Sequence, residues 1–146
     1  MTTVAEILKD KGSDVWSISP EQNVYDAIKL MSEKSAGALA VVSKGSLAGI
    51  LSERDYARKV ILKGRSSKET RVKEIMTTHV YHTIPSQEVE ACMVVMTKHH
   101  IRHLPVLEDK TLVGMISLGD VVKVIIKQQQ DTIKQLEHTV TWQESY

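Results

Sequence analysis

The second half of this sequence repeats the first half at a constant spacing. When residues 15–60 are laid on residues 80–125 without a gap, every residue faces the one 65 positions further along the chain. The matched positions are mostly apolar or glycine, and the last two are polar: Val15/Val80, Pro20/Pro85, Gln22/Gln87, Val24/Val89, Met31/Met96, Leu39/Leu104, Val41/Val106, Leu47/Leu112, Gly49/Gly114, Ser52/Ser117 and Asp55/Asp120. Such self-similarity is typical of a duplicated supersecondary unit. The first constraint on the fold is therefore that it contains two equivalent halves.

Length and composition favour an ordinary globular protein. A chain of 146 residues suffices for one compact module, whereas either half alone would be marginal. The formal net charge is +1, with 25% charged and 42% hydrophobic residues, so we expect neither a nucleic acid nor a membrane as partner. Residues 1–11 carry no signal pattern, no apolar run reaches membrane-spanning length, and Cys92 is the only cysteine. We therefore expect a cytoplasmic protein without disulfides.

The spacing of the apolar residues changes from segment to segment within each half. Apolar residues three and four positions apart predict a helix over about residues 22–35. Two short apolar runs, at residues 38–42 and 47–51, flank the turn Lys44-Gly45-Ser46 and predict a hairpin. A further helix is expected after Ser52, which can cap it. The second half follows the same course, so each half is predicted to be a β-α-β-β-α unit.

The chain is expected to divide into two repeats and a tail. Residues 4–8 and 72–76 have similar sequences, and each is predicted to form a short helix that leads into a repeat. Beyond Ile126 the chain becomes polar, but Ile133, Leu136 and Val140 keep helical spacing, so we expect a protruding helix that could pack on a second copy. The predicted divisions are residues 1–65 for the first repeat with its lead-in, 66–126 for the second repeat with its lead-in, and 127–146 for the C-terminal helix.

Both halves resemble the CBS (cystathionine β-synthase) domain, and the whole chain resembles a stand-alone tandem pair of such domains. The resemblance rests on the helix ends Leu30-Met31 and Val95-Met96, the strand Arg102-His103-Leu104-Pro105-Val106, and the Gly-x-hydrophobic-hydrophobic-Ser-x-x-Asp segments at 49–55 and 114–120. It implies an α+β fold in which two pseudo-symmetric repeats pack as one module with a helical extension. It also implies two clefts between the repeats, of a kind that commonly binds AMP, ADP, ATP, NAD or S-adenosylmethionine.

The Ser-x-x-Asp segments suit a nucleotide for a physical reason. A carboxylate at a helix start can accept hydrogen bonds from both hydroxyls of a ribose, which makes Asp55 and Asp120 the ribose candidates. The hydroxyls of Ser52 and Ser117, with the unpaired N–H groups of the same helix starts, could receive a phosphate. The alternative is that Ser-x-x-Asp only caps a helix.

The two repeats differ around this segment, so the clefts are expected to be unequal. Arg54 precedes Asp55 and would add a charge that pairs with phosphate, whereas Gly119 precedes Asp120 and would let backbone approach the ligand. Family resemblance adds residues on the strands and at the start of each repeat. The nucleotide-binding candidates are Ile18, Gly37, Ala38, Ser52, Arg54, Asp55, Thr83, Pro85, Arg102, His103, Pro105, Ser117, Gly119 and Asp120, with Arg65 and Lys68 as further phosphate contacts.

Two alternatives remain for these cations. Arg102 could be a surface strand residue paired with an acidic neighbour, and the basic residues of the linker, Arg65 and Lys68 among them, could simply be solvated.

Histidines cluster in the second half, but their spacing matches no recognised metal site. His79, His82, His99, His100 and His103 have no thiolate or acidic residue at a spacing that would complete a zinc site. We therefore expect no metal, with a histidine-dependent metal protein as an alternative. The chain also contains no nucleophile–base pair and no phosphate-binding glycine loop of the Walker type, so we do not expect an enzyme.

Together these features predict a regulatory module that senses the energy or redox state of the cell. The expected ligand is an adenosyl nucleotide, NAD or AMP first, and the signal would pass to a separate effector protein. A homodimer is expected. The alternative is a scaffold that dimerises or binds partners and whose clefts stay empty.

Overall fold

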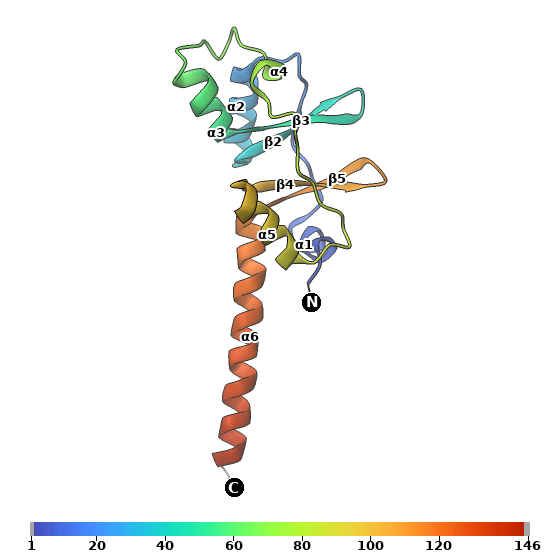
Figure 1. Cartoon of the computed structure of the whole chain (residues 1–146), viewed down its shortest axis with the longest axis vertical. Helices are drawn as coiled ribbons and strands as arrows, with labels where there is room; N and C mark the ends of the chain where they lie inside the picture. The colour runs from blue at the N-terminus through green and yellow to red at the C-terminus, as the bar shows by residue number, and fades with distance from the viewer. Residues whose placement is uncertain (1, 145–146) are drawn as a thin grey trace.

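The structure is a computed structural model that describes residues 2–144, and it has two similar units stacked one above the other with a long helix projecting from one end (Figure 1). The first repeat and its preceding helix contain α1 Val4–Lys11, β1 Ser17–Ile18, α2 Val24–Lys34, β2 Ala38–Ser43, β3 Ser46–Ser52, α3 Glu53–Tyr56 and the π-helical turn η1 Ala57–Ile61. The second contains α4 Val72–Ile75, α5 Val89–His99, β4 His103–Glu108, β5 Thr111–Ser117 and α6 Leu118–Glu144.

The two repeats share strand register in detail. In the first, β1 pairs with β2 in parallel and β2 with β3 antiparallel, with Ala38 opposite Ser52. In the second, β4 and β5 pair with His103 opposite Ser117, and the first strand is reduced to one parallel bridge between Thr83 and Val106. Both hairpins shift register at the same point, after Val41 and after Val106. The predicted α+β fold of two pseudo-symmetric repeats is confirmed.

The long helix of each repeat ends in the same way. The predicted helix over residues 22–35 is α2, which begins after Asn23, whose side chain accepts a hydrogen bond from the Asp26 N–H at 2.8 Å. It ends at Ser35 with a φ of 52°, and α5 ends at the matching residue His100 with a φ of 54°. Both residues are in the left-handed conformation that commonly stops a helix.

Each short lead-in helix packs against the other repeat. The core of the first repeat includes Val72 and Ile75 of α4, and the core of the second includes Val4 and Ile7 of α1. The backbone follows the same exchange: the Val72 N–H donates to the Gln22 carbonyl and the Val4 N–H to the Gln87 carbonyl, both at 2.9 Å. The predicted division of the repeats at residue 65 follows the order of the chain. In space, however, α1 lies beside α5 of the second repeat, and α4 lies beside α2 of the first (Figure 1). The crossing interlocks the repeats.

The C-terminal helix is the direct continuation of the second repeat. The sequence predicted a helix from Leu118 and a protruding helix beyond Ile126, and the structure has one continuous helix, α6, of 27 residues from Leu118. Val121 near its start is buried in the second core, and the helix then extends away from the repeats (Figure 1). Ile126, Ile133 and Leu136 are exposed on this extension, and the side chain of Val140 lies outside the described residues. Among the helices described, none is long and apolar enough to cross a membrane.

Candidate functional site: a cavity between the repeats

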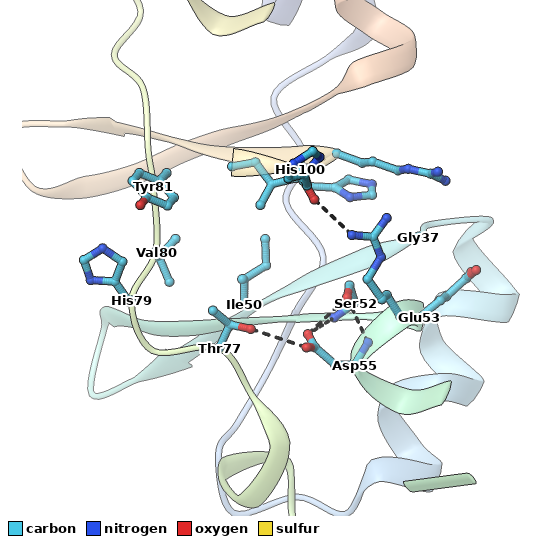
Figure 2. A pocket seen from close by; sticks show the side chains of 14 residues that line it. Gly37, Ile50, Ser52, Glu53, Asp55, Thr77, His79, Val80, Tyr81 and His100 are labelled. Carbon is cyan, nitrogen blue, oxygen red and sulfur yellow. Dashed lines mark hydrogen bonds between the residues drawn. The ribbon is translucent and has the colours of Figure 1, made fainter. Parts of the chain in front are cut away.

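A cavity of about 380 Å³ opens where the two repeats face each other (Figure 2). Its lining comes from four places: the start of β2, the end of β3 with the start of α3, the segment after α4, and the residues between α5 and β4. The lining residues are Gly37, Ile50, Ser52, Glu53, Arg54, Asp55, Thr77, His79, Val80, Tyr81, His100, Ile101, Arg102 and His103. Six of the predicted site residues thus meet in one place: Gly37, Ser52, Arg54, Asp55, Arg102 and His103.

Asp55 lies at the start of α3 and already has internal partners. Its Oδ2 accepts hydrogen bonds from the Ser52 N–H at 2.9 Å and the Ser52 hydroxyl at 3.0 Å, and Ser52 Oγ accepts from the Asp55 N–H at 3.1 Å. Its Oδ1 accepts from the Thr77 hydroxyl at 3.4 Å and lies 3.1 Å from the ammonium of Lys59. The capping role weighed as an alternative is therefore present, in a carboxylate that also lines the cavity.

Arg54 bridges the two repeats across the cavity. Its Nη1 donates to the carbonyl of His100 at 2.9 Å, as the dashed line in Figure 2 shows. Arg102 and His103, from the second repeat, line the same cavity as Arg54, from the first. The two repeats meet at this point. Arg54, just after β3, and Arg102, just after α5, therefore lie in the same cavity.

His103 fills the space beside Gly37. A Cβ added at Gly37 would lie 3.2 Å from the ring carbon Cε1 of His103, so only glycine fits there without a shift of the ring. Burial first, and then the charge of Lys11, lowers the pKa of His103 below its usual 6.5, although Asp120 opposes the shift. The ring is therefore neutral at pH 7, and the permanent positive charges of the lining are those of Arg54 and Arg102.

The segment between α4 and the second repeat forms an aromatic wall that the sequence did not reveal. The ring of Tyr81 stacks on His99 with centroids 3.9 Å apart, and His79 meets Tyr81 edge-on at 5.2 Å. His79, Val80 and Tyr81 all line the cavity. The repeat carried a signal for this wall, because Tyr81 is matched by Trp16, another aromatic residue, in the first half.

The second Ser-x-x-Asp segment has the same cap but a different environment. Asp120 Oδ2 accepts from the Ser117 N–H at 2.8 Å, and Ser117 Oγ accepts from the Asp120 N–H at 3.1 Å. The same Oδ2 also lies 2.7 Å from the ammonium of Lys11, which donates in addition to the Met115 carbonyl at 3.0 Å. The carboxylate is thus held in an internal ion pair.

This ion pair sets the protonation of Asp120. Burial alone would raise the pKa of the carboxyl, but the hydrogen bonds from Lys11 and Ser117 and the charge of Lys11 outweigh it, and the pKa lies below the usual 3.8. Since the folded-state pKa is the lower one, the pair stabilises the fold above pH 3.8, and this stability is lost as the pH falls through the folded-state pKa.

The other predicted residues lie away from the main cavity. Thr83 is buried, lies 3.4 Å from Cys92 Sγ, and lines a separate cavity of about 190 Å³. Arg65 pairs with Glu74, and the Lys68 ammonium lies 5.0 Å from the centre of the Tyr25 ring. Nothing crowds Gly119, because a Cβ there would meet only Ser117 Oγ at 3.6 Å. The predicted residues outside the lining of the main cavity are Ile18, Ala38, Thr83, Pro85, Pro105, Ser117, Gly119, Asp120, Arg65 and Lys68.

The histidines do not converge as metal ligands do. Within the described part of the chain, no three His, Cys, Asp or Glu side chains lie close enough together to hold a metal ion. His79 and His99 instead stack with Tyr81, and His103 packs on Gly37.

This pair of interlocked repeats around a shared cavity defines the class of protein. The model of the CBS domain family matches residues 4–62 and 72–127, and the chain belongs to this family. A CBS domain pair is a regulatory type of module.

The similarity to known proteins covers most of the chain. The chain is 41% identical over 145 residues to the CBS domain-containing protein CBSX3, mitochondrial, of Arabidopsis thaliana, covering 92% of this chain and 70% of that protein. A solved protein with CBS domains from Burkholderia ambifaria MC40-6 is 55% identical, with a TM-score of 0.84 over 88% of this chain and 96% of that one. The CBS domain pair of protein MJ0100, solved with 5′-methylthioadenosine and S-adenosyl-L-methionine, has a TM-score of 0.78 over 88% of this chain and 98% of that one. At 23% identity, it shows likeness of fold alone.

Proposed function

We propose that the chain is a regulatory module that binds an adenosyl nucleotide in the cavity between its repeats and passes the signal to an effector protein. The observation that carries the proposal is the meeting of Asp55, Arg54 and Arg102 in one cavity with an aromatic wall. NAD and AMP are the first candidates, and ATP, ADP and S-adenosylmethionine are the others.

Each part of such a ligand finds a matching group. The Asp55 carboxylate would accept hydrogen bonds from the ribose hydroxyls, which displace or share its bond from Thr77. The guanidinium groups of Arg54 and Arg102 would pair with phosphate. Tyr81 and Ile101 would contact the flat faces of the base. A volume of about 380 Å³ lies within the usual range for small-molecule sites.

One solved protein of the same fold is a precedent for a ligand of this chemistry. One CBS domain pair of the same fold was solved with two adenosyl compounds, 5′-methylthioadenosine and S-adenosyl-L-methionine. Ligand binding would act by favouring one arrangement of the two repeats, because a ligand shifts an equilibrium only as far as its affinities for the two states differ. Arg54 and its bond to the His100 carbonyl join the repeats at the cavity, so a phosphate that captured Arg54 would change that link.

We further propose that the protein acts as a homodimer in the cytoplasm and has no catalytic activity of its own. Exposed apolar residues on and near α5 and on α6, namely Ile84, Val94, Ile126, Ile133 and Leu136, would be covered by a second copy. Since the Arabidopsis relative is named as mitochondrial, fractionation of the native host should test the compartment directly. The rival function, a scaffold with empty clefts, needs the same dimer but no ligand.

Thermal unfolding with and without nucleotides separates the two functions. A ligand at 100 times its dissociation constant adds about 2.7 kcal/mol to the free energy of unfolding. For a domain of this size that corresponds to a rise in melting temperature of roughly 5–10 °C. We expect such a rise with at least one of AMP, ADP, ATP, NAD and S-adenosylmethionine at millimolar concentration, and none with inorganic phosphate, which lacks the ribose and the base. An unchanged melting temperature across the whole panel favours the scaffold.

A further inference from the structure

The two lead-in helices are equivalent, but α1 is longer than α4. Val4 matches Val72, 68 positions further on, whereas Val15 matches Val80, 65 positions further on. Three extra residues therefore lie between Leu8 and Val15. The structure places them in the helix, because α1 has eight residues and α4 has four.

Packing confirms which residues correspond. A Cβ added at Gly49 would meet the side chain of Met76, and one added at the matching Gly114 would meet the side chain of Leu8. Leu8 and Met76 thus occupy the same place in the two repeats. Beyond them the chains diverge, since Thr77 follows Met76 directly, whereas residues 9–11 add a turn of helix after Leu8.

We call the main cavity, beside Asp55, the first cleft, and the matching place beside Asp120 the second cleft. The added turn brings Lys11 to the place in the second cleft that Thr77 occupies in the first. Thr77 donates its N–H to the Ile50 carbonyl at 2.9 Å and its hydroxyl to Asp55 at 3.4 Å. Lys11 donates through its single ammonium to the matching groups, the Met115 carbonyl at 3.0 Å and Asp120 at 2.7 Å.

The second cleft also lacks the counterparts of the first cleft's cations. The residues that match Arg54 and Arg102 are Gly119 and Gly37. Instead, the Lys11 ammonium lies 2.7 Å from Asp120 Oδ2, where the diol of a ribose would have to bind. Asp55 also has a lysine partner, but the Lys59 ammonium lies further away, at 3.1 Å from Oδ1, and Lys59 is the more exposed of the two lysines. Ser117 and Asp120 line neither of the two cavities described above, whereas Ser52 and Asp55 line the larger one.

We propose that Lys11 is a specificity-determining residue that competes with the ligand for Asp120, so that the first cleft fills before the second. The inference rests on the proposed function, because it assumes that a ribose binds these carboxylates. A ligand enters the second cleft only by displacing the ammonium. About a third of the Lys11 side chain is exposed (37%), so the displaced ammonium can reach water. Lys11 therefore lowers the affinity of the second cleft for the ligand but does not abolish binding there.

Calorimetric titration of the whole chain with AMP tests the competition. The wild type is expected to bind one AMP per chain at concentrations that saturate the first cleft. Lys11→Met keeps the aliphatic stem and removes the charge, and it should strengthen the second binding event about fivefold. Lys9→Met, an exposed lysine on the same helix, is the matched control and should titrate like the wild type. The α1 helix stays anchored by Val4, Ile7 and Leu8, so both variants should fold.

A second pair of variants assigns the binding event to its cleft. In an Asp55→Ala background the first cleft should bind AMP about 10- to 100-fold more weakly. Adding Lys11→Met to that background should still strengthen binding at the second cleft about fivefold. Two equal sites in the wild type, or a Lys11→Met titration that superimposes on the wild-type curve, would overturn the competition and leave the nucleotide function standing. Absence of binding in every variant would overturn both.

Discussion

Replacing Asp55 with alanine is expected to weaken the affinity for AMP about 10- to 100-fold. A hydrogen bond to a charged group contributes roughly 1.5–3 kcal/mol, and alanine cannot accept the hydrogen bonds of the ribose hydroxyls. Asp55 also caps α3, so its loss should cost about 1 kcal/mol of stability without unfolding the chain. Calorimetric titration measures the affinity, and the melting temperature measures the lost cap.

Two further variants separate binding from capping. Asp55→Asn keeps an oxygen that can accept from Ser52 and removes the charge, so it should recover stability but not affinity. Asp26→Ala removes a carboxylate from the same position of α2, three residues after its cap Asn23 and outside the cavity lining, and should bind AMP like the wild type. Wild-type affinity in Asp55→Ala would remove the ribose assignment.

Replacing Gly49 with alanine is expected to lower the free energy of unfolding by roughly 1–3 kcal/mol, in the range of overpacked cores. The added Cβ would lie 2.7 Å from the Thr77 carbonyl oxygen and 3.0 Å from Met76 Sδ. Because Thr77 is joined to Ile50 by two backbone hydrogen bonds, the backbone cannot yield without breaking them. The displaced segment continues into residues 79–81, so AMP affinity should fall as well.

Urea unfolding measures this loss, and Gly119→Ala is its control for stability. The Cβ of Gly119→Ala would make only an ordinary contact at 3.6 Å, at an exposed position of a helix. Alanine there should leave stability unchanged or raise it by up to about 1 kcal/mol. If Gly49→Ala were as stable as Gly119→Ala, the close approach of Thr77 would not be a constraint on the fold.

The local structure was readable from the sequence because local patterns determine it. Apolar spacing located α2 within two residues at its start and one at its end, and the Lys44-Gly45-Ser46 turn located the hairpin that follows. Because the second half of the sequence repeats the first, the same helix and hairpin were predicted for the second repeat. The exchange of α1 and α4 was not predictable in this way, because Val4 and Ile7 present the same apolar pattern as Val72 and Ile75, and either helix would suit either core.

Only the part of the site that lies in one short segment was predicted from the sequence. Ser52, Asp55 and Arg54 belong to one short segment, and their grouping follows from sequence. Their meeting with Arg102 and Tyr81 depends on how two distant segments approach each other, which no local pattern encodes. The pairing of Lys11 with Asp120 had a signal, namely the change of repeat spacing from 68 to 65, but its meaning required the packing of Leu8 on Gly114.

A crystal structure of the wild-type chain with AMP tests most directly whether the cavity between the repeats holds the nucleotide. We expect the ribose hydroxyls within hydrogen-bonding distance of Asp55, the phosphate beside Arg54 and Arg102, and, at an AMP concentration that fills only the first cleft, the Lys11 ammonium still on Asp120. AMP bound with its ribose away from Asp55, or first in the cleft of Asp120, would contradict the proposed site.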